Sequence, residues 1–363
     1  MIDRRYIAHL DWIIIGAALI LSLMGIATIF SATFAQDAHF YKKQFSWLVI
    51  GLFIMIPIVA VNYSHFSRFG YVIFAASILS LLLALTIGRT VAGAQRWISL
   101  GFLSFQPSEF AKIAFIIALA KHLSSVKVPP KGLDFKELIA PLAILFVPFI
   151  LIAKQPDLGT ALIFCAIFAS MTLMMRIRFR VLLAAAGGMA ILMPLAWGHL
   201  KAYQKARVLS FIDPSKDPLG SGYHIIQSKI AVGSGGIIGK GFTQGTQGSL
   251  MFLPEHHTDF IFSILSEEWG FAGVLAVLLL FLTLILRGMD VVKNAKDRFG
   301  FLVSFGIISM LFWHVAINLG MVTGLLPVVG VPLPFFSYGG SFLLTVLISM
   351  ALLININMRR FSL

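Results

Sequence analysis

Long apolar runs, separated by short polar connections, follow one another along almost the whole chain. A run of about 20 apolar residues can cross the roughly 30 Å hydrocarbon core of a bilayer as a helix. We therefore expect an all-α, polytopic integral membrane protein, with residues 1–363 forming a single transmembrane domain. The pattern predicts ten transmembrane helices, at residues 11–32, 45–61, 69–87, 105–120, 138–153, 158–175, 181–198, 259–286, 301–325 and 337–357.

The composition excludes an ordinary soluble domain. Hydrophobic residues make up 59% of the 363 and charged residues only 12%, about half the roughly 25% that is usual in soluble domains. Arg4 and Arg5 precede the first apolar run, as in a signal peptide, but the run is too long for one and further spans follow. We interpret it as an uncleaved first helix.

The basic residues indicate the orientation, because Lys and Arg accumulate in short cytoplasmic loops. If both termini are cytoplasmic, the short external loops hold only Lys42, Lys43, Arg89, Arg96 and Lys154, and most other basic residues face inward. The net charge of +13 then reflects this asymmetry and contact with anionic lipid, so nucleic acid is not an expected partner. The single Cys165 excludes an internal disulfide and a cysteine metal site.

One connection is much longer than the others. Residues 199–257, before the eighth predicted helix, form a large extracytoplasmic loop rich in Gly, Ser and Gln. Loops of this length usually carry function or are disordered. The apolar residues Ile225, Ile226, Ile230 and Val232 predict short amphipathic segments at the membrane surface.

The glycine-rich GSGGIIGKG in this loop does not match a phosphate loop. Ser234 stands where that motif needs its first Gly, and Gly241 follows Lys240 where it needs Ser or Thr. Successive backbone N–H groups can still form an anion-binding nest. These amides and Lys240 could therefore receive a lipid pyrophosphate.

Ionisable residues gather where the eighth predicted helix begins, in FLPEHHTDFIFSILSEEWGF. Glu255, His256, His257 and Asp259 resemble a metal cluster, but neighbours on a helix point about 100° apart, so we interpret the histidines as an interfacial cap. Asp259 precedes a run of apolar residues. It is either an N-cap or a desolvated carboxylate suited to chemistry.

Glu267 and Glu268 lie about 12 Å further along the same predicted helix. Either the helix has a polar face there, or it begins near Trp269 and residues 258–268 form a separate helix at the outer surface. Both alternatives fit the pattern.

A second polar stripe occurs in QPSEFAK, where Gln106, Glu109 and Lys112 recur every three residues and so share one helix face. A charge in a span is costly unless it is paired or faces a cavity. Glu109 and Lys112 can pair, and the pair could be purely structural.

Two further charged residues lie in external connections. Asp157, in the hairpin KQPDLGT, could be an N-cap of the sixth helix, and Arg96 stands beside Trp97, an aromatic residue suited to the interface. The predicted topology brings these residues, the Gln106–Lys112 stripe, Lys240 and Asp259 to the outer surface. A site of this kind could handle an amphiphile with an anionic headgroup.

Several of these motifs occur together in a known family. QPSEFAK, KQPDLGT, QSKIAVGSGGIIGKG, FLPEHHTDFIFSILSEEWGFAG and GLLPVVGVPLPFFSYGGS resemble, in order and over the whole chain, the SEDS family (shape, elongation, division and sporulation), and are most similar to its RodA branch. The resemblance implies a peptidoglycan glycosyltransferase of the bacterial cytoplasmic membrane that polymerises lipid II during cell elongation. It also implies a class B penicillin-binding protein as transpeptidase partner.

The resemblance also assigns residues. The family's essential aspartate corresponds to Asp259, its transmembrane Glu and Lys to Glu109 and Lys112, its hairpin aspartate to Asp157 and its loop arginine to Arg96.

The implied chemistry suits these residue types. A sugar hydroxyl is a weak nucleophile, so a placed carboxylate, Asp259, can serve as general base. An α-linked polyprenyl-pyrophosphate donor that gives a β-1,4 product implies inversion by one displacement. Arg96 and Lys240 would match the pyrophosphate charge, with Lys112 or a divalent cation (Mg²⁺ or Mn²⁺) as further candidates, and Glu109 would shape the cavity.

Two other classes of function remain open from the residues alone. A flippase would also use ten spans with buried charges, but it needs a polar path across the whole membrane, whereas the clearest charges lie in the outer half. A scaffold that only positions partner enzymes would tolerate loss of Asp259.

Overall fold

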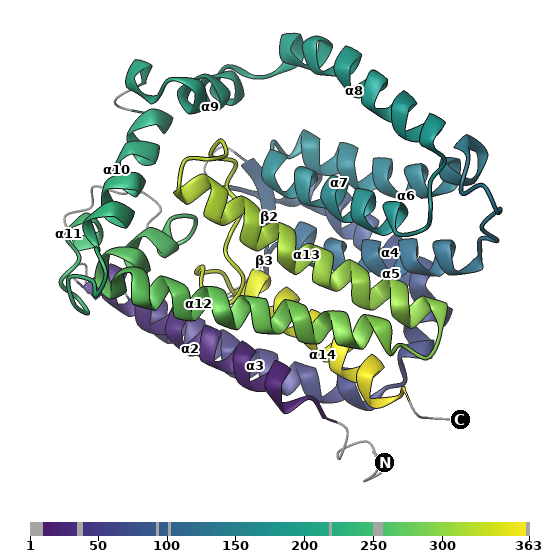
Figure 1. The fold of residues 1–363 in the computed structure, drawn as a ribbon, viewed down its shortest axis with the longest axis horizontal. Helices are drawn as coiled ribbons and strands as arrows, with labels where there is room; N and C mark the ends of the chain where they lie inside the picture. The colour runs from purple at the N-terminus through teal and green to yellow at the C-terminus, as the bar shows by residue number, and fades with distance from the viewer. Residues whose placement is uncertain are drawn as a thin grey trace.

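The computed structural model describes residues 10–34, 39–91, 94–100, 103–217, 220–249 and 257–360. Most of the long helices lie side by side in one bundle, with α2 beginning and α14 ending at the same end (Figure 1). Each predicted span overlaps one helix. These helices are α2 (Trp12–Thr33), α3 (Phe40–Ala60), α4 (Tyr63–Ile87), α5 (Pro107–Ser125), α6 (Phe135–Lys154), α7 (Leu158–Leu173), α8 (Phe179–His199), α12 (Ile261–Lys293), α13 (Arg298–Val322) and α14 (Gly340–Met358).

Within the described ranges, seven of these helices are long and apolar enough to cross a membrane, namely α2, α3, α4, α6, α12, α13 and α14. The other three depart from that standard for different reasons. α5 contains three charged residues, Glu109, Lys112 and Lys121. α7 is short, and only residues 179–195 of α8 form an apolar segment. The chain is therefore a multi-pass membrane protein.

The expectation of a purely α-helical chain is wrong between α4 and α5. The strands β1 (Arg89–Val91), β2 (Ala94–Leu100) and β3 (Leu103–Phe105) form a small antiparallel sheet in the order β1-β2-β3. Strands of three to seven residues give too short an alternation to stand out beside long apolar helices. The sheet carries Arg96 in its central strand.

The long segment before α12 is largely helical. It contains α9 (Ala202–Ile212), the 3-10 turn η2 (Pro214–Lys216), α10 (Ser221–Ser234) and the short α11 (Thr246–Ser249). The prediction of short amphipathic helices is confirmed for α10, since Ile225 is buried while Ile226 and Ile230 are exposed. Their contact with a membrane surface remains a prediction.

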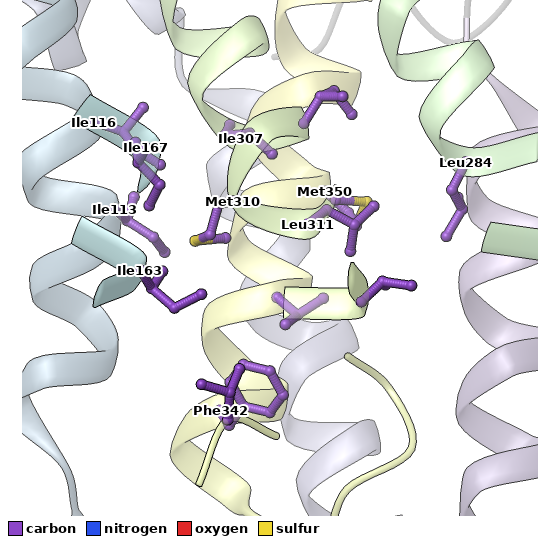
Figure 2. Close-up of a cluster of buried hydrophobic side chains, with 14 of the residues drawn as sticks. Ile113, Ile116, Ile163, Ile167, Leu284, Ile307, Met310, Leu311, Phe342 and Met350 are labelled. Atoms are coloured by element: carbon purple, nitrogen blue, oxygen red, sulfur yellow. The ribbon is translucent and has the colours of Figure 1, made fainter. Parts of the chain in front are cut away.

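The core lies between α5, α7, α12, α13 and α14. Figure 2 shows Ile113 and Ile116 of α5 facing Ile163 and Ile167 of α7, with Met310 of α13 beside them. In contrast, α8 stands apart from the bundle in Figure 1, and most of its apolar side chains are exposed. Exposed apolar side chains are ordinary on a surface that faces lipid.

The end of α14 holds the end of α3. Pro57 lies inside α3, near its last turn. The last backbone carbonyls of α3 accept hydrogen bonds from two side chains at the end of α14. Arg359 donates to Val59 O at 3.1 Å and to Ala60 O at 2.8 Å. Asn355 Nδ2 donates to the carbonyls of Ile58 and Val61. The last carbonyls of a helix need such donors where water is absent.

Replacing Arg359 by Ala is expected to destabilise the bundle by about 1–3 kcal/mol, because the α3 carbonyls lose buried donors. Thermal unfolding of the purified protein in detergent measures the loss. Lys293→Ala, at an exposed residue of the same end, is the control and should leave unfolding within about 0.5 kcal/mol of wild type. Equal effects of the two substitutions would contradict the proposed cap.

Candidate active site

Two motifs far apart in sequence meet at the end of the bundle where α12 begins and α13 ends. Tyr338 N donates to His257 O at 2.9 Å, and Ser337 Oγ donates to Thr258 O at 2.7 Å. The turn before α12 is thus fastened to the connection between α13 and α14, residues 323–339.

Asp259 lies in this fastened turn. The interpretation of Asp259 as an N-cap is wrong, because α12 begins at Ile261 with Phe260 at the cap position and no capping side chain. Asn318 Nδ2 donates to the Asp259 carbonyl at 2.9 Å, and a Cβ placed on Gly330 would lie 3.3 Å from Asp259 Oδ2. Gly330 has a φ of 73°, so both the backbone conformation and the nearby carboxylate favour glycine there.

Asp157 lies beside the same connection. Its Oδ1 accepts from Thr160 N at 3.2 Å, which confirms the N-cap interpretation, and its Oδ2 lies 3.1 Å from Arg96 Nη1. The Asp157 side chain is 3% exposed and that of Arg96 29%. A Cβ on Gly159 would lie only 2.4 Å from Val329 O, so the start of α7 packs directly on this connection.

Lys112 is almost completely buried and has three partners. Its Nζ lies 2.9 Å from Glu109 Oε2, 3.1 Å from His314 Nε2 and 5.1 Å from the centre of the Phe342 ring. His314 Nδ1 faces Pro332 O at 3.2 Å. Because a carbonyl only accepts, Nδ1 carries the proton and Nε2 accepts from the Lys112 ammonium group.

Residues 328–333 form a hub, a segment of the α13–α14 connection that contacts several of the predicted site residues or their neighbours. Asp259 contacts this hub at Gly330, Asn318 donates to Val331 O at 2.8 Å and His314 faces Pro332 O. The start of α7, with Asp157, packs on it as well. Arg96 joins this group through its ion pair with Asp157. Five of the six predicted site residues are thus brought into one cluster.

Lys240, the sixth residue, belongs to a separate cluster. Its Nζ lies 2.6 Å from Glu267 Oε1, and the same carboxylate accepts from the backbone N–H groups of Thr246 and Gln247. Glu267 is fully buried. Its carboxylate caps the N-terminus of α11 and neutralises the charge of Lys240. About eight residues of helix, roughly 12 Å, separate this cluster from Asp259.

The glycine-rich segment is a structural element, and the expected anion nest is wrong for its last two amides. Lys240 N donates to Glu267 O and Gly241 N to Glu268 O, each at 3.0 Å. A Cβ on Gly239 would lie 2.1 Å from Glu268 O. The glycines therefore allow the loop to approach the helix backbone closely.

That close approach explains the position of the two glutamates. α12 is interrupted at Gly270, where φ is 62° and ψ −162°, and residues 261–269 form a short helix of their own. Phe271 N donates to Gly236 O at 2.9 Å, so the loop supplies partners at the break. The short helix was one of the two sequence interpretations, but it is buried rather than lying on the outer surface. Glu268 accepts from Ser31 of α2.

Replacing Gly239 by Ala is expected to destabilise the protein by about 1–3 kcal/mol, because φ is 88° and the new Cβ would meet the Glu268 carbonyl. Gly233→Ala, in α10 with no atom within 4 Å of the added Cβ, is the matched control. Thermal unfolding of both variants checks this expectation. A Gly239→Ala variant as stable as the control would show that the contact is not needed.

His314 and Asn318 are two further site residues that the sequence pattern did not single out. They are spaced four residues apart and therefore share one face of α13. Polar residues at this spacing in an apolar span are the same signal that singled out Glu109 and Lys112. Both are buried, at 3% and 0% exposure.

Glu255 and His256, part of the cluster considered for metal binding, lie outside the described residues. Within the described ranges, no three His, Cys, Asp or Glu side chains are placed to hold a metal ion. A groove of about 190 Å³ between α3, α4, α5 and α14 is lined by apolar residues, among them Phe110 and Ile113.

Comparison with known proteins shows which family the chain is similar to. The model of the Cell cycle protein family (FtsW, RodA and SpoVE) matches residues 4–361. The chain is 38% identical to the peptidoglycan glycosyltransferase MrdB of Escherichia coli K12, covering 97% of this chain and 94% of the relative. It is 33% identical to the peptidoglycan glycosyltransferase RodA of Treponema pallidum, covering 98% and 99%.

A solved structure is similar over the same length. A chain of a peptidoglycan synthase complex, studied for its coordination of polymerization and crosslinking, superposes with a TM-score of 0.84 at 34% identity, covering 97% of this chain and 99% of that one. The match of nearly every residue to one family model, together with these identities, leads to one conclusion. The chain belongs to the FtsW, RodA and SpoVE family of cell cycle proteins.

Proposed function

We propose that the cluster around residues 328–333 is the active site of a peptidoglycan glycosyltransferase that polymerises lipid II during cell elongation. The chain is a peptidoglycan glycosyltransferase by its relatives, which are named for this activity. In this proposal, residues 1–363 form a single domain with ten spans and both termini cytoplasmic, so that the cluster would face outward from the bacterial cytoplasmic membrane. The excess of basic residues at the opposite end supports this orientation.

The observation that carries the proposal is the different exposure of the three carboxylates of the cluster. Glu109 and Asp157 are buried and each is paired with a cation, Lys112 and Arg96. Burial closes both of these carboxylates to an incoming substrate, and each already contacts its cation partner. Asp259 is partly exposed, and it can therefore reach an incoming hydroxyl.

The reaction then follows by one displacement. The 4-hydroxyl of the acceptor N-acetylglucosamine gives its proton to the Asp259 carboxylate as its oxygen attacks the anomeric carbon of the donor. The bond from that carbon to the polyprenyl pyrophosphate breaks, and the bonding pair leaves with the pyrophosphate. Attack from the opposite face inverts the α-linkage to β-1,4.

The cations have different parts in this proposal. Arg96 is partly exposed and can share its charge between Asp157 and the leaving pyrophosphate. Lys240 is also partly exposed, but Glu267 neutralises its charge. Because this pair lies about 12 Å along the helix from Asp259, we assign Lys240 to contact with the lipid headgroup and not to the reaction itself. Lys112, at 1% exposure, holds the site together through Glu109 and His314.

A transpeptidase of the penicillin-binding class is the proposed partner, because the similar solved chain comes from a complex that couples polymerization with crosslinking. The partner would crosslink the strands that this chain produces at the same outer face.

Polymerisation in detergent micelles tests the function against the flippase alternative. A flippase needs two separated membrane faces, whereas a polymerase needs only substrate. Purified protein and lipid II should therefore give glycan strands in micelles, alone or with a partner whose transpeptidase serine is inactivated. Transport in sealed vesicles without any polymer in either system would instead support a flippase, and neither activity would support a scaffold.

A further inference from the structure

A second cavity lies at the end of the bundle opposite to the candidate active site. Its volume is about 380 Å³, within the range of ligand-binding pockets. Its walls come from the α5–α6 connection, the α7–α8 connection and the start of α13. With the topology proposed above, it opens at the cytoplasmic boundary of the membrane.

The walls of this cavity are fastened to each other. Leu133 N donates to Arg176 O at 2.8 Å and Arg178 N donates to Leu133 O at 3.1 Å, so the two connections pair like adjacent strands. Leu133 is fully buried, and Arg176 takes a left-handed conformation with φ of 54°. A non-glycine residue in this conformation persists only where the surroundings impose it. The cavity is therefore preformed.

The lining is cationic. Arg176 and Arg298 both line the cavity, and none of the described residues that line it is acidic. Arg298 Nη1 donates to Val126 O at 2.7 Å, which fixes the guanidinium at the rim. No carboxylate lies within 4 Å of either guanidinium in the described ranges.

Nearby carboxylates are occupied elsewhere. Asp134 is shared by Arg178 and Arg180. Hydrogen bonding from the Phe135 backbone and from Arg180 lowers the pKa of Asp134, so it remains ionised for that pairing. Asp297, adjacent to Arg298, accepts from the Tyr63 hydroxyl at 2.6 Å and from the backbone of α13. The two lining arginines therefore present a net positive charge to the cavity.

The remaining lining is apolar and includes Val128, Met174 and Phe301. Two guanidinium groups beside apolar walls at a membrane boundary match one chemistry, a phosphodiester attached to hydrocarbon. A free phosphate would gain nothing from the apolar side. We propose that this cavity binds the headgroup of an anionic phospholipid, with its phosphate between Arg176 and Arg298 and the start of its acyl chains against Val128, Met174 and Phe301.

Lipid retention by the full-length protein tests the proposal. Phosphatidylglycerol and phosphatidylcholine are added in equal amounts to the protein in detergent, and native mass spectrometry measures the bound ratio. Wild type should prefer phosphatidylglycerol, and Arg176→Gln with Arg298→Gln should reduce that preference about tenfold or more. Lys136→Gln with Lys293→Gln removes two exposed charges outside the cavity lining and is the matched control.

The controls separate the alternatives. An equal loss in the control pair would mean general surface attraction and would overturn the site. Competition by inorganic phosphate at the concentration of the lipid would overturn the lipid assignment in favour of a free anion. Arg176→Gln alone changes an exposed side chain, so it should keep wild-type unfolding in phosphatidylcholine and still lose part of the preference. Full preference in that folded variant would contradict the proposal.

Discussion

The Asp259→Asn variant is expected to polymerise lipid II about 10²- to 10⁴-fold more slowly than wild type, which is the usual contribution of a general base. Asn has nearly the shape of Asp, so the fastening of the turn through the Asp259 carbonyl and Asn318 should persist. The rate of strand formation in micelles, measured at saturating lipid II, gives the effect. Since the base acts in the transition state, kcat should fall more than KM changes.

A matched control comes from the other end of the same helix. Asp290 is exposed in α12, so Asp290→Asn makes the same chemical change away from the site and should leave the rate unchanged. If a well-folded Asp259→Asn variant polymerises at the wild-type rate, Asp259 is not the base. A loss confined to an unfolded variant would be seen as a lowered unfolding temperature.

The Lys112→Met variant is expected to destabilise the protein by about 3–5 kcal/mol, because it leaves the Glu109 carboxylate buried without its counter-charge. His314 would also lose the donor at its Nε2. The double variant Glu109→Gln with Lys112→Met removes both charges and should recover a large part of that stability. Unfolding in detergent, compared across wild type, both single variants and the double variant, gives the coupling energy.

Lys121→Met in the same helix is the control for this series. Lys121 Nζ donates to Arg68 O in an exposed position, so its loss should cost less than about 1 kcal/mol. Purely additive effects of the Glu109 and Lys112 substitutions would contradict the pairing. Low polymerase activity in a stable double variant would show that the pair also positions the hub.

The membrane class, the helices and most of the site follow from the sequence, because their signals are local or come from recognised motifs. Apolar runs of span length mark the helices wherever they occur, and charges such as Glu109 and Lys112 stand out in such runs. The small sheet around Arg96 was missed because its strands are too short to show a period. Its contribution, the Arg96–Asp157 pair, depends on residues about 60 positions apart.

The break at Gly270 shows where local reasoning ends. The sequence allowed either a polar face or a separate helix for Glu267 and Glu268, since both fit the spacing. Which of the two forms depends on whether another segment supplies hydrogen-bond partners where α12 is interrupted at Gly270. Residues 235–241 supply them, through backbone hydrogen bonds to residues more than 25 positions later in the chain. The same contact makes the glycines structural rather than anion-binding.

The sequence by itself determined that this protein lies in a membrane, which segments are helical and which ionisable residues are unusual there, because each of these depends on neighbours along the chain. Only the tertiary structure decided which of those residues meet. Residues 328–333 contact Asp259, the start of α7 beside Asp157, and His314 and Asn318 of α13. His314 in turn contacts Lys112. Such contacts arise from packing in three dimensions, and no periodicity along the chain records them.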